Sequence, residues 1–127
     1  MTETAWSETD LSQIDGHDEV RIASLRPGGT LSSGRIIWAV RLGDTVYVRS
    51  VNGPGSAWYR STRHRHEGQL RAGSLTKDIT MLDVDHAGDI EDRIDAAYRA
   101  KYASYPGPVA RITASQARAT TLQLVPR

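Results

Sequence analysis

Alternation of apolar and polar residues predicts β-strands along much of the chain, and the clearest signal lies near the middle. Side chains in a strand point alternately to its two faces, so a two-residue period indicates a strand. Two such runs, Ile36–Leu42 and Thr45–Val51, flank Gly43-Asp44, which is a typical two-residue hairpin turn. The sequence therefore predicts a β-hairpin from Ile36 to Val51.

Four more segments show the strand pattern. Gly73-Ser74 is a second two-residue hairpin signal and joins two of them. The loop Arg26–Gly34 consists mostly of turn-forming residues, and a loop of this length is often a binding loop. The four predicted strands are Val20–Leu25, Gln69–Ala72, Leu75–Val84 and Thr120–Val125.

A short helix is predicted near the N-terminus, where Ser7 is a suitable N-cap for a helix that runs to Ile14. Trp6 and Leu11 have the spacing of a hydrophobic staple around that cap. Gly16 follows at the position where a helix often ends in a left-handed residue. We expect this helix to pack on one end of a sheet.

Two longer helices are predicted further along. Ser56 precedes a helix over Ala57–His66, and Asp89 precedes the strongest helical pattern, Ile90–Tyr105. We expect Pro106-Gly107-Pro108 to end the second helix and Ser115 to begin one further turn. The apolar stripe of the second helix is Ile90, Ile94, Ala97, Tyr98 and Tyr102.

The order of these elements predicts the fold class. Six strands, mostly joined by hairpins and interrupted by helices, favour an α+β protein that is mainly β: an antiparallel β-barrel with flanking helices. A length of 127 residues is typical of one domain, so residues 1–127 are expected to form a single domain.

Composition excludes several classes of function. The chain has no cysteine, which excludes disulfides, thiolate catalysis and cysteine-ligated metal centres. A formal net charge of +1 is too small to predict a nucleic-acid-binding face. The sequence has neither a signal-peptide pattern nor an apolar run of the ~20 residues that span a bilayer. We therefore expect a cytoplasmic protein with no nucleic acid or membrane as partner.

The strongest candidate for chemistry is the segment that follows the predicted hairpin. Gly53 allows the backbone to approach a ligand closely, and Ser56 begins a helix whose N-terminal N–H groups attract anions. Arg60 and Arg63 share one side of that helix, and arginine binds phosphate or carboxylate with two hydrogen bonds. This pattern predicts either an anion-binding site or a tight turn followed by a solvated basic helix.

Three other groups have a structural interpretation beside a chemical one. The His-x-His pair at residues 64–66 diverges on a helix, so no metal site is predicted there. Asp83 and Asp85 either perform acid–base chemistry or form a solvated strand end. Tyr98 and Tyr102 either pack in the core or donate a phenol proton to a substrate.

Nearly the whole chain resembles a family of small uncharacterised actinobacterial proteins. The stretches with close counterparts in that family are Ile37–Arg41, Val46–Ser50, Ala97–Tyr102 and Ala119–Arg127. Ser50-Val51-Asn52-Gly53, Ala57-Trp58-Tyr59-Arg60 and the hairpin Gln69–Lys77 more distantly resemble deazaflavin-dependent nitroreductases. The distant resemblance implies a flavin-reductase-like split barrel, usually a homodimer with ligand sites between its subunits.

The same resemblance implies a small-molecule-binding oxidoreductase that uses FMN or a deazaflavin, without a metal, to transfer hydride to a small organic acceptor. An alternative interpretation is a cofactor-free binding or tailoring protein for a small anionic metabolite. The candidate cofactor-binding residues are Arg49, Ser50, Asn52, Gly53, Trp58, Arg60 and Arg63, and the candidate substrate-binding residues are Trp38, Tyr98 and Tyr102.

Overall fold

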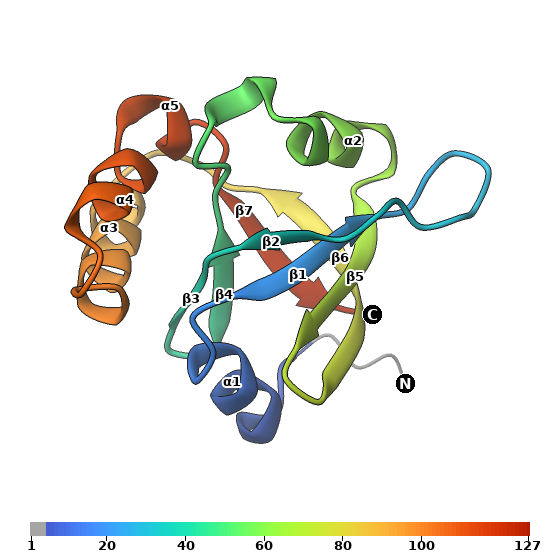
Figure 1. Ribbon diagram of the computed structural model, residues 1–127, viewed down its shortest axis with the longest axis horizontal. Coiled ribbons are helices and arrows are strands. Elements are labelled where there is room, and N and C mark those ends of the chain that lie inside the picture. The colour runs from blue at the N-terminus through green and yellow to red at the C-terminus, as the bar shows by residue number, and fades with distance from the viewer. Residues whose placement is uncertain (1–4) are drawn as a thin grey trace.

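The computed structural model describes residues 5–127, which fold around one antiparallel sheet (Figure 1). Neighbouring strands are hydrogen-bonded in the order β2-β1-β5-β6-β7-β4-β3. The seven strands of the described residues are β1 (Val20–Ser24), β2 (Arg35–Ile37), β3 (Ala39–Leu42), β4 (Thr45–Val48), β5 (Glu67–Ala72), β6 (Leu75–Asp83) and β7 (Leu122–Pro126).

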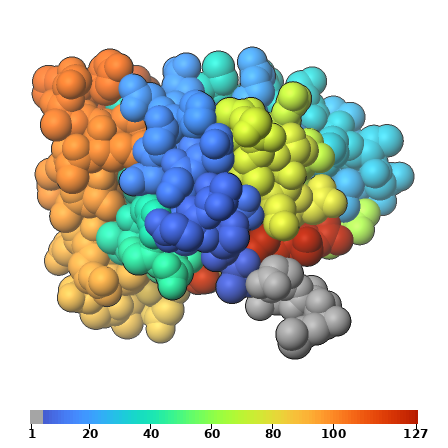
Figure 2. All heavy atoms as spheres, turned by 90° about the horizontal axis from the view of Figure 1, so that it is seen from below, coloured from blue at the N-terminus to red at the C-terminus, as the bar shows by residue number. Residues whose placement is uncertain are grey.

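Helices cover both ends and one side of the sheet. In Figure 1, α1 lies below the strands, α2 lies above them, and α3 to α5 lie to their left. Figure 2 shows from below how α1 spreads over its end of the barrel beside the β5–β6 hairpin. The helices are α1 (Glu8–Asp15), α2 (Ala57–Arg65), α3 (Ile90–Lys101), α4 (Pro106–Ile112) and α5 (Ser115–Arg118), and a 3₁₀ turn, η1 (Gly53–Gly55), precedes α2.

Trp38 stands between the two edges of the sheet. The edge strands β2 and β3 are consecutive in the chain, and this one residue separates them. β2 pairs with β1 while β3 pairs with β4, so the chain passes from one edge directly to the other and the sheet curls into a nearly closed barrel. The predicted α+β barrel is confirmed, with seven strands instead of six because Ile36–Leu42 divides at Trp38.

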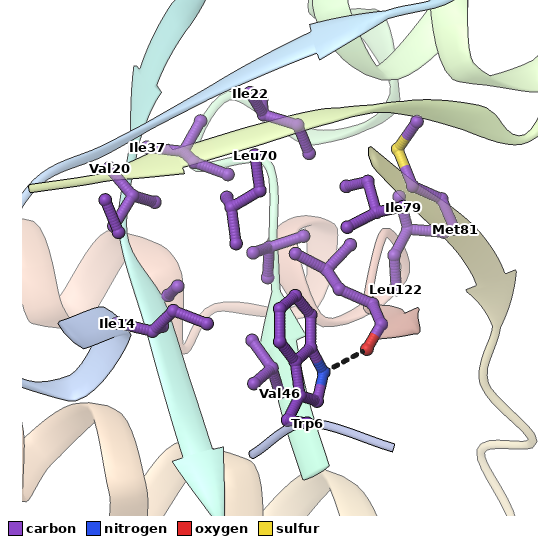
Figure 3. Packing of buried hydrophobic residues seen from close by; sticks show 14 of the residues in the cluster. Trp6, Ile14, Val20, Ile22, Ile37, Val46, Leu70, Ile79, Met81 and Leu122 are labelled. Atoms are coloured by element: carbon purple, nitrogen blue, oxygen red, sulfur yellow. Dashed lines mark hydrogen bonds between the residues drawn. The ribbon is translucent and has the colours of Figure 1, made fainter. Parts of the chain in front are cut away.

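The barrel interior holds the larger apolar cluster (Figure 3). Ile22, Leu70 and Ile79 come from successive neighbours in the sheet and are at most 1% exposed. Trp6 closes the cluster from outside the strands, and its indole Nε1 donates a hydrogen bond of 2.9 Å to the carbonyl of Leu124. That bond satisfies the polar end of a buried ring, as burial of tryptophan requires.

A second cluster lies outside the barrel, between α3 and the β3–β4 hairpin. Ala39 and Val48 belong to the interior cluster, whereas Val40 and Tyr47 pack with Tyr98 of α3. The hairpin is therefore apolar on both faces, because one face meets the barrel interior and the other meets a helix. The predicted helical stripe of α3 also packs in this second cluster.

Local predictions hold better at helix starts than at helix ends. The Ser7 cap is confirmed, since its Oγ accepts a hydrogen bond of 3.1 Å from the Asp10 N–H. The left-handed conformation predicted for Gly16 is wrong, because its φ is −79°. The second long helix ends at Lys101 rather than Tyr105, and the Pro106 segment begins α4 instead of only ending a helix. Proline is favoured at a first helical position, where no N–H partner is needed.

In the described part of the chain, no helix is both long and apolar enough to cross a bilayer.

Gly68 provides a test of the packing between β1 and β5. A Cβ at this position would lie 2.0 Å from the carbonyl oxygen of Ala23 and 2.9 Å from Met81 Cε. We expect Gly68→Ala to lower the free energy of unfolding by about 3 kcal/mol or more, because backbone must move. Urea unfolding measures this loss. Gly107→Ala is the control, since a Cβ there meets nothing within 4 Å, and it should leave stability unchanged or slightly raised. Equal stability of the two variants would contradict the packing described.

Candidate functional site

A cavity of about 520 Å³ opens at the end of the barrel beside Trp38. Five segments form its lining: Glu19 before β1, the β2 edge with Trp38, the chain after β4, the start of α2, and α4. A cavity of this volume holds a small organic ligand or a cofactor. The barrel topology therefore brings together segments as far apart in the chain as Glu19 and Ile112.

Apolar side chains form most of the cavity wall. Trp38 lies on it and is fixed by Tyr102, whose ring stacks on the indole at 3.8 Å between centroids and 3° between planes. Trp58, Ile37 and Ile112 contribute further apolar surface. Broad indole faces of this kind suit a planar ligand.

The start of α2 forms one part of the cavity lining. Ser50 Oγ lies 2.7 Å from the Gly53 carbonyl and 2.7 Å from Ser56 Oγ, so the two hydroxyls bond each other. Ser56 therefore makes no side-chain cap on the helix it precedes. The first N–H groups of a helix have no partner within the helix and carry partial positive charge. Ser56, Ala57 and Trp58, which open α2, line the cavity and make its end suitable for anionic or carbonyl oxygens.

Charged side chains stand at the cavity lining as well. Arg35 and Arg111 are exposed and form no ion pair within residues 5–127. The Arg111 guanidinium donates a hydrogen bond of 2.8 Å to Asn52 Oδ1, which links α4 to the segment after β4. Glu19 adds a carboxylate to the same lining. The cavity thus combines two cationic groups with one acidic group.

Arg49 lies under this cavity in a buried network. Its guanidinium is completely covered and pairs with Glu91 at 2.6 Å and with Asp95 at 2.5 Å. It also donates to Thr121 Oγ1 at 3.0 Å and to the Ile112 carbonyl at 3.1 Å. A guanidinium with two carboxylate partners has its charge balanced inside the fold. The side chain of Arg49 therefore holds the lining in place, and it has no donor to spare for a ligand.

The structure brings some of the sequence-predicted residues together at the cavity. Ser50, Asn52, Trp38 and Trp58 line it, and so does Arg49, although its guanidinium is covered. Gly53 is buried next to the lining in a left-handed conformation with φ 78°, and a Cβ there would meet Gln116 at 3.3 Å.

Other predicted residues lie elsewhere. Arg60 is exposed on α2 and does not line the cavity, and Arg63 pairs with Asp83 at 2.5 Å on the surface. Tyr98 and Tyr102 are fully buried, so they have the packing role that was one of their two interpretations. Their hydroxyls donate to the carbonyls of Trp38 at 2.8 Å and Asp18 at 2.6 Å.

Sequence reasoning missed two cationic residues of the lining, Arg35 and Arg111. Arg35 precedes a predicted strand, where an arginine has no distinguishing feature. Arg111 belongs to α4, and the sequence pattern predicts the proline-rich start of that helix only as the end of the preceding one. Proline at a first helical position was the available signal for α4.

A protein-family model described as "Uncharacterized protein conserved in bacteria (DUF2255)" matches residues 10–124. The sequence matches none of the curated proteins with which it was compared. HutZ, the heme storage protein from Vibrio cholerae, has a TM-score of 0.64 at 10% identity, covering 94% of this chain and 88% of HutZ. The FAD- and heme-binding protein from Mycobacterium smegmatis has a TM-score of 0.55 at 16% identity, covering 94% and 65% of the two chains. An F420 reductase has a TM-score of 0.51 at 16% identity, covering 91% and 90%. At these identities the likeness establishes the fold alone.

The buried network gives a prediction about stability. Arg49→Met removes the one fully buried cation that Glu91 and Asp95 share and leaves them only the more exposed His86 and Arg118, so we expect a loss of about 3 kcal/mol in the free energy of unfolding. Urea denaturation followed by circular dichroism measures it. Arg60→Met replaces an exposed arginine and should change stability by no more than about 0.5 kcal/mol. A loss of the same size in both variants would show that the network does not support the fold.

The buried tyrosines give a prediction about pH. Burial raises the pKa of Tyr98 and of Tyr102 well above the ordinary value of 10.0. Their neutral forms therefore favour the folded state, fully below about pH 10 and progressively less at higher pH, where the unfolded chain ionises first. Tyr98→Phe should reduce the fall in unfolding free energy between about pH 9 and about pH 11. Tyr105→Phe changes a ring that is 44% exposed and is the control. Its unfolding free energy should fall over this pH range as much as that of the parent protein. An unchanged fall in Tyr98→Phe would contradict this account.

Proposed function

The chain belongs to the bacterial family DUF2255, and from the form of its cavity we propose that it binds a flavin or deazaflavin and transfers hydride to a small organic acceptor. One observation carries this proposal: two indoles and the uncapped start of α2 line the same cavity. A flat aromatic ring system with polar oxygens and an anionic tail needs both kinds of surface.

The residues of the cavity fit such a cofactor. Trp38 and Trp58 pack against its ring, while the N–H groups at Ala57 and Trp58 donate to ring or phosphate oxygens. The amide of Asn52 and the guanidinium of Arg111 hold an anionic group at the mouth. When bound, the cofactor supplies the hydride chemistry, and the protein supplies orientation and electrostatics. Two proteins that share the fold are named for FAD and heme binding and for F420 reduction, which supports the proposal through the fold.

A cofactor-free protein for a small anionic metabolite is the second candidate. Its supporting observation is that Arg60 and Arg63 lie outside the cavity, which leaves fewer cations for a nucleotide-like tail than the sequence predicted. The visible absorption spectrum of the freshly purified protein, before and after addition of FMN or a deazaflavin, separates the two candidates. A protein that stays colourless and shows no spectral change would exclude the first.

Ala57→Asp tests the cavity without damaging the helix. A carboxylate at the first position of α2 favours the helix dipole and should keep or raise the melting temperature. The same carboxylate lies on the cavity lining and repels an anionic ligand, so we expect the affinity for FMN or deazaflavin to fall about tenfold or more.

Fluorescence titration measures the affinity of this variant. Ala96→Asp makes the same change at an exposed position of α3 outside the lining, and it should bind like the parent protein. Parental affinity in Ala57→Asp would contradict the proposed site. Equal loss in both variants would indicate an effect of net charge and would also contradict it.

The homodimer implied by the resemblance and the cytoplasmic location expected from the sequence belong to the same proposal. Ile36 supports the dimer, because this side chain lines the cavity and is still 52% exposed, as expected for a surface that a second subunit covers. The mass in solution by light scattering checks the assembly.

A further inference from the structure

Arg21 and Arg71 face each other on an open part of the sheet. Figure 1 shows β1, β2 and β5 toward the viewer with no helix in front of them. In the register of β1 and β5, Arg21 is the direct partner of Arg71, and Ile36 of β2 is the partner of Arg21 on its other side. Directly opposed residues of an antiparallel pair have Cα atoms about 4.5–5.5 Å apart, so both guanidinium groups occupy the same small region.

Neither arginine has its charge balanced. Among residues 5–127, no carboxylate lies within ion-pair distance of Arg21 or Arg71. Arg21 makes one long hydrogen bond, of 3.4 Å, to the Gly34 carbonyl. Asp78 of β6 is the direct strand partner of Gln69 and forms no ion pair with either arginine. Like charges directly opposite each other destabilise a strand pair, so this arrangement favours an anion between them.

Two hollows flank the pair, and both arginines line each of them. The first has a volume of about 340 Å³ and includes Glu19 and Ile36, which also line the main cavity. The second has a volume of about 300 Å³ and includes Ser32, Gln69 and Gly34. An anion avoids Glu19, so the second hollow is the favoured side, where the Gln69 amide offers a further donor.

We propose that Arg21 and Arg71 form a binding site for a phosphoryl group in this second hollow. One carboxylate is satisfied by a single guanidinium, whereas a phosphate monoester has about two negative charges and three free oxygens at neutral pH. Two guanidiniums on neighbouring strands match both that charge and that number of acceptors. The second hollow shares no lining residue with the main cavity, so the phosphoryl group bound there is a ligand of the sheet surface. The anion site itself does not depend on what the cavity holds.

Inorganic phosphate is the probe for this site. In a titration followed by ¹H–¹⁵N NMR, saturable shifts are expected at the Nε–H groups of Arg21 and Arg71 and at the amides of Gly34 and Gln69. Arg71→Gln and Arg21→Gln should each weaken phosphate binding by about tenfold. Arg99→Gln, at an exposed arginine on α3, is the matched control and should bind like the parent protein. Shifts spread over many arginines, or equal affinity in all variants, would overturn the proposal.

Thermal unfolding gives a second test, because the substitution that weakens phosphate binding should not lower the melting temperature of the free protein. Arg71→Gln removes a repulsive contact, so the free variant should melt at the parental temperature or slightly above it. Phosphate should raise the melting temperature of the parent more than that of the variant. A variant that is stabilised by phosphate as much as the parent would refute the site. If Ala57→Asp loses flavin binding but still binds phosphate, the result would support the site at Arg21 and Arg71 and would show that it lies apart from the main cavity.

Discussion

The guanidinium of Arg49 ties together parts of the fold that lie far apart in the sequence. It follows β4, pairs with Glu91 and Asp95 of α3, and donates to the carbonyl of Ile112 at the end of α4 and to Thr121 beside β7. Water does not reach it, so each partner is needed to balance its charge or satisfy its donors. The relative positions of a strand end and two helices thus depend on one buried cation.

That network also fixes the cavity, because the same backbone segments serve both. Ser50 follows Arg49 directly and Asn52 lies in the same segment, while Arg111 precedes the residue whose carbonyl Arg49 binds. Once α4 is held at Ile112, Arg111 reaches Asn52 at 2.8 Å. A polar site is oriented by a rigid buried shell beneath it, which is the usual requirement for precise ligand geometry.

Features of the fold that depend on neighbouring residues could be predicted from the sequence, and features that depend on distant contacts could not. Gly43 and Gly73 are at turns with φ 58°, as their two-residue hairpin signals indicate. The division of a strand at Trp38 is invisible to the apolar pattern, which continues unchanged through it. That division arises because β2 and β3 pair with different strands, a constraint set by barrel closure. The candidate site was predicted in part for the same reason: Ser50 and Trp58 flank one turn, whereas Arg111 arrives from another helix.

The arginines show why residue type alone does not establish a role. Arg49 and Arg63 are both candidate cofactor-binding residues from the sequence, yet carboxylates of the fold pair with both. Arg111, Arg21 and Arg71 carry no sequence pattern, and within the described residues they form no ion pair. A guanidinium that is already neutralised gains little from an external anion, while an unpaired one next to a hollow gains the full charge-assisted bond. The ion-pair partners of each arginine therefore decide whether it supports the barrel or remains available for a ligand, and only the folded chain determines those partners.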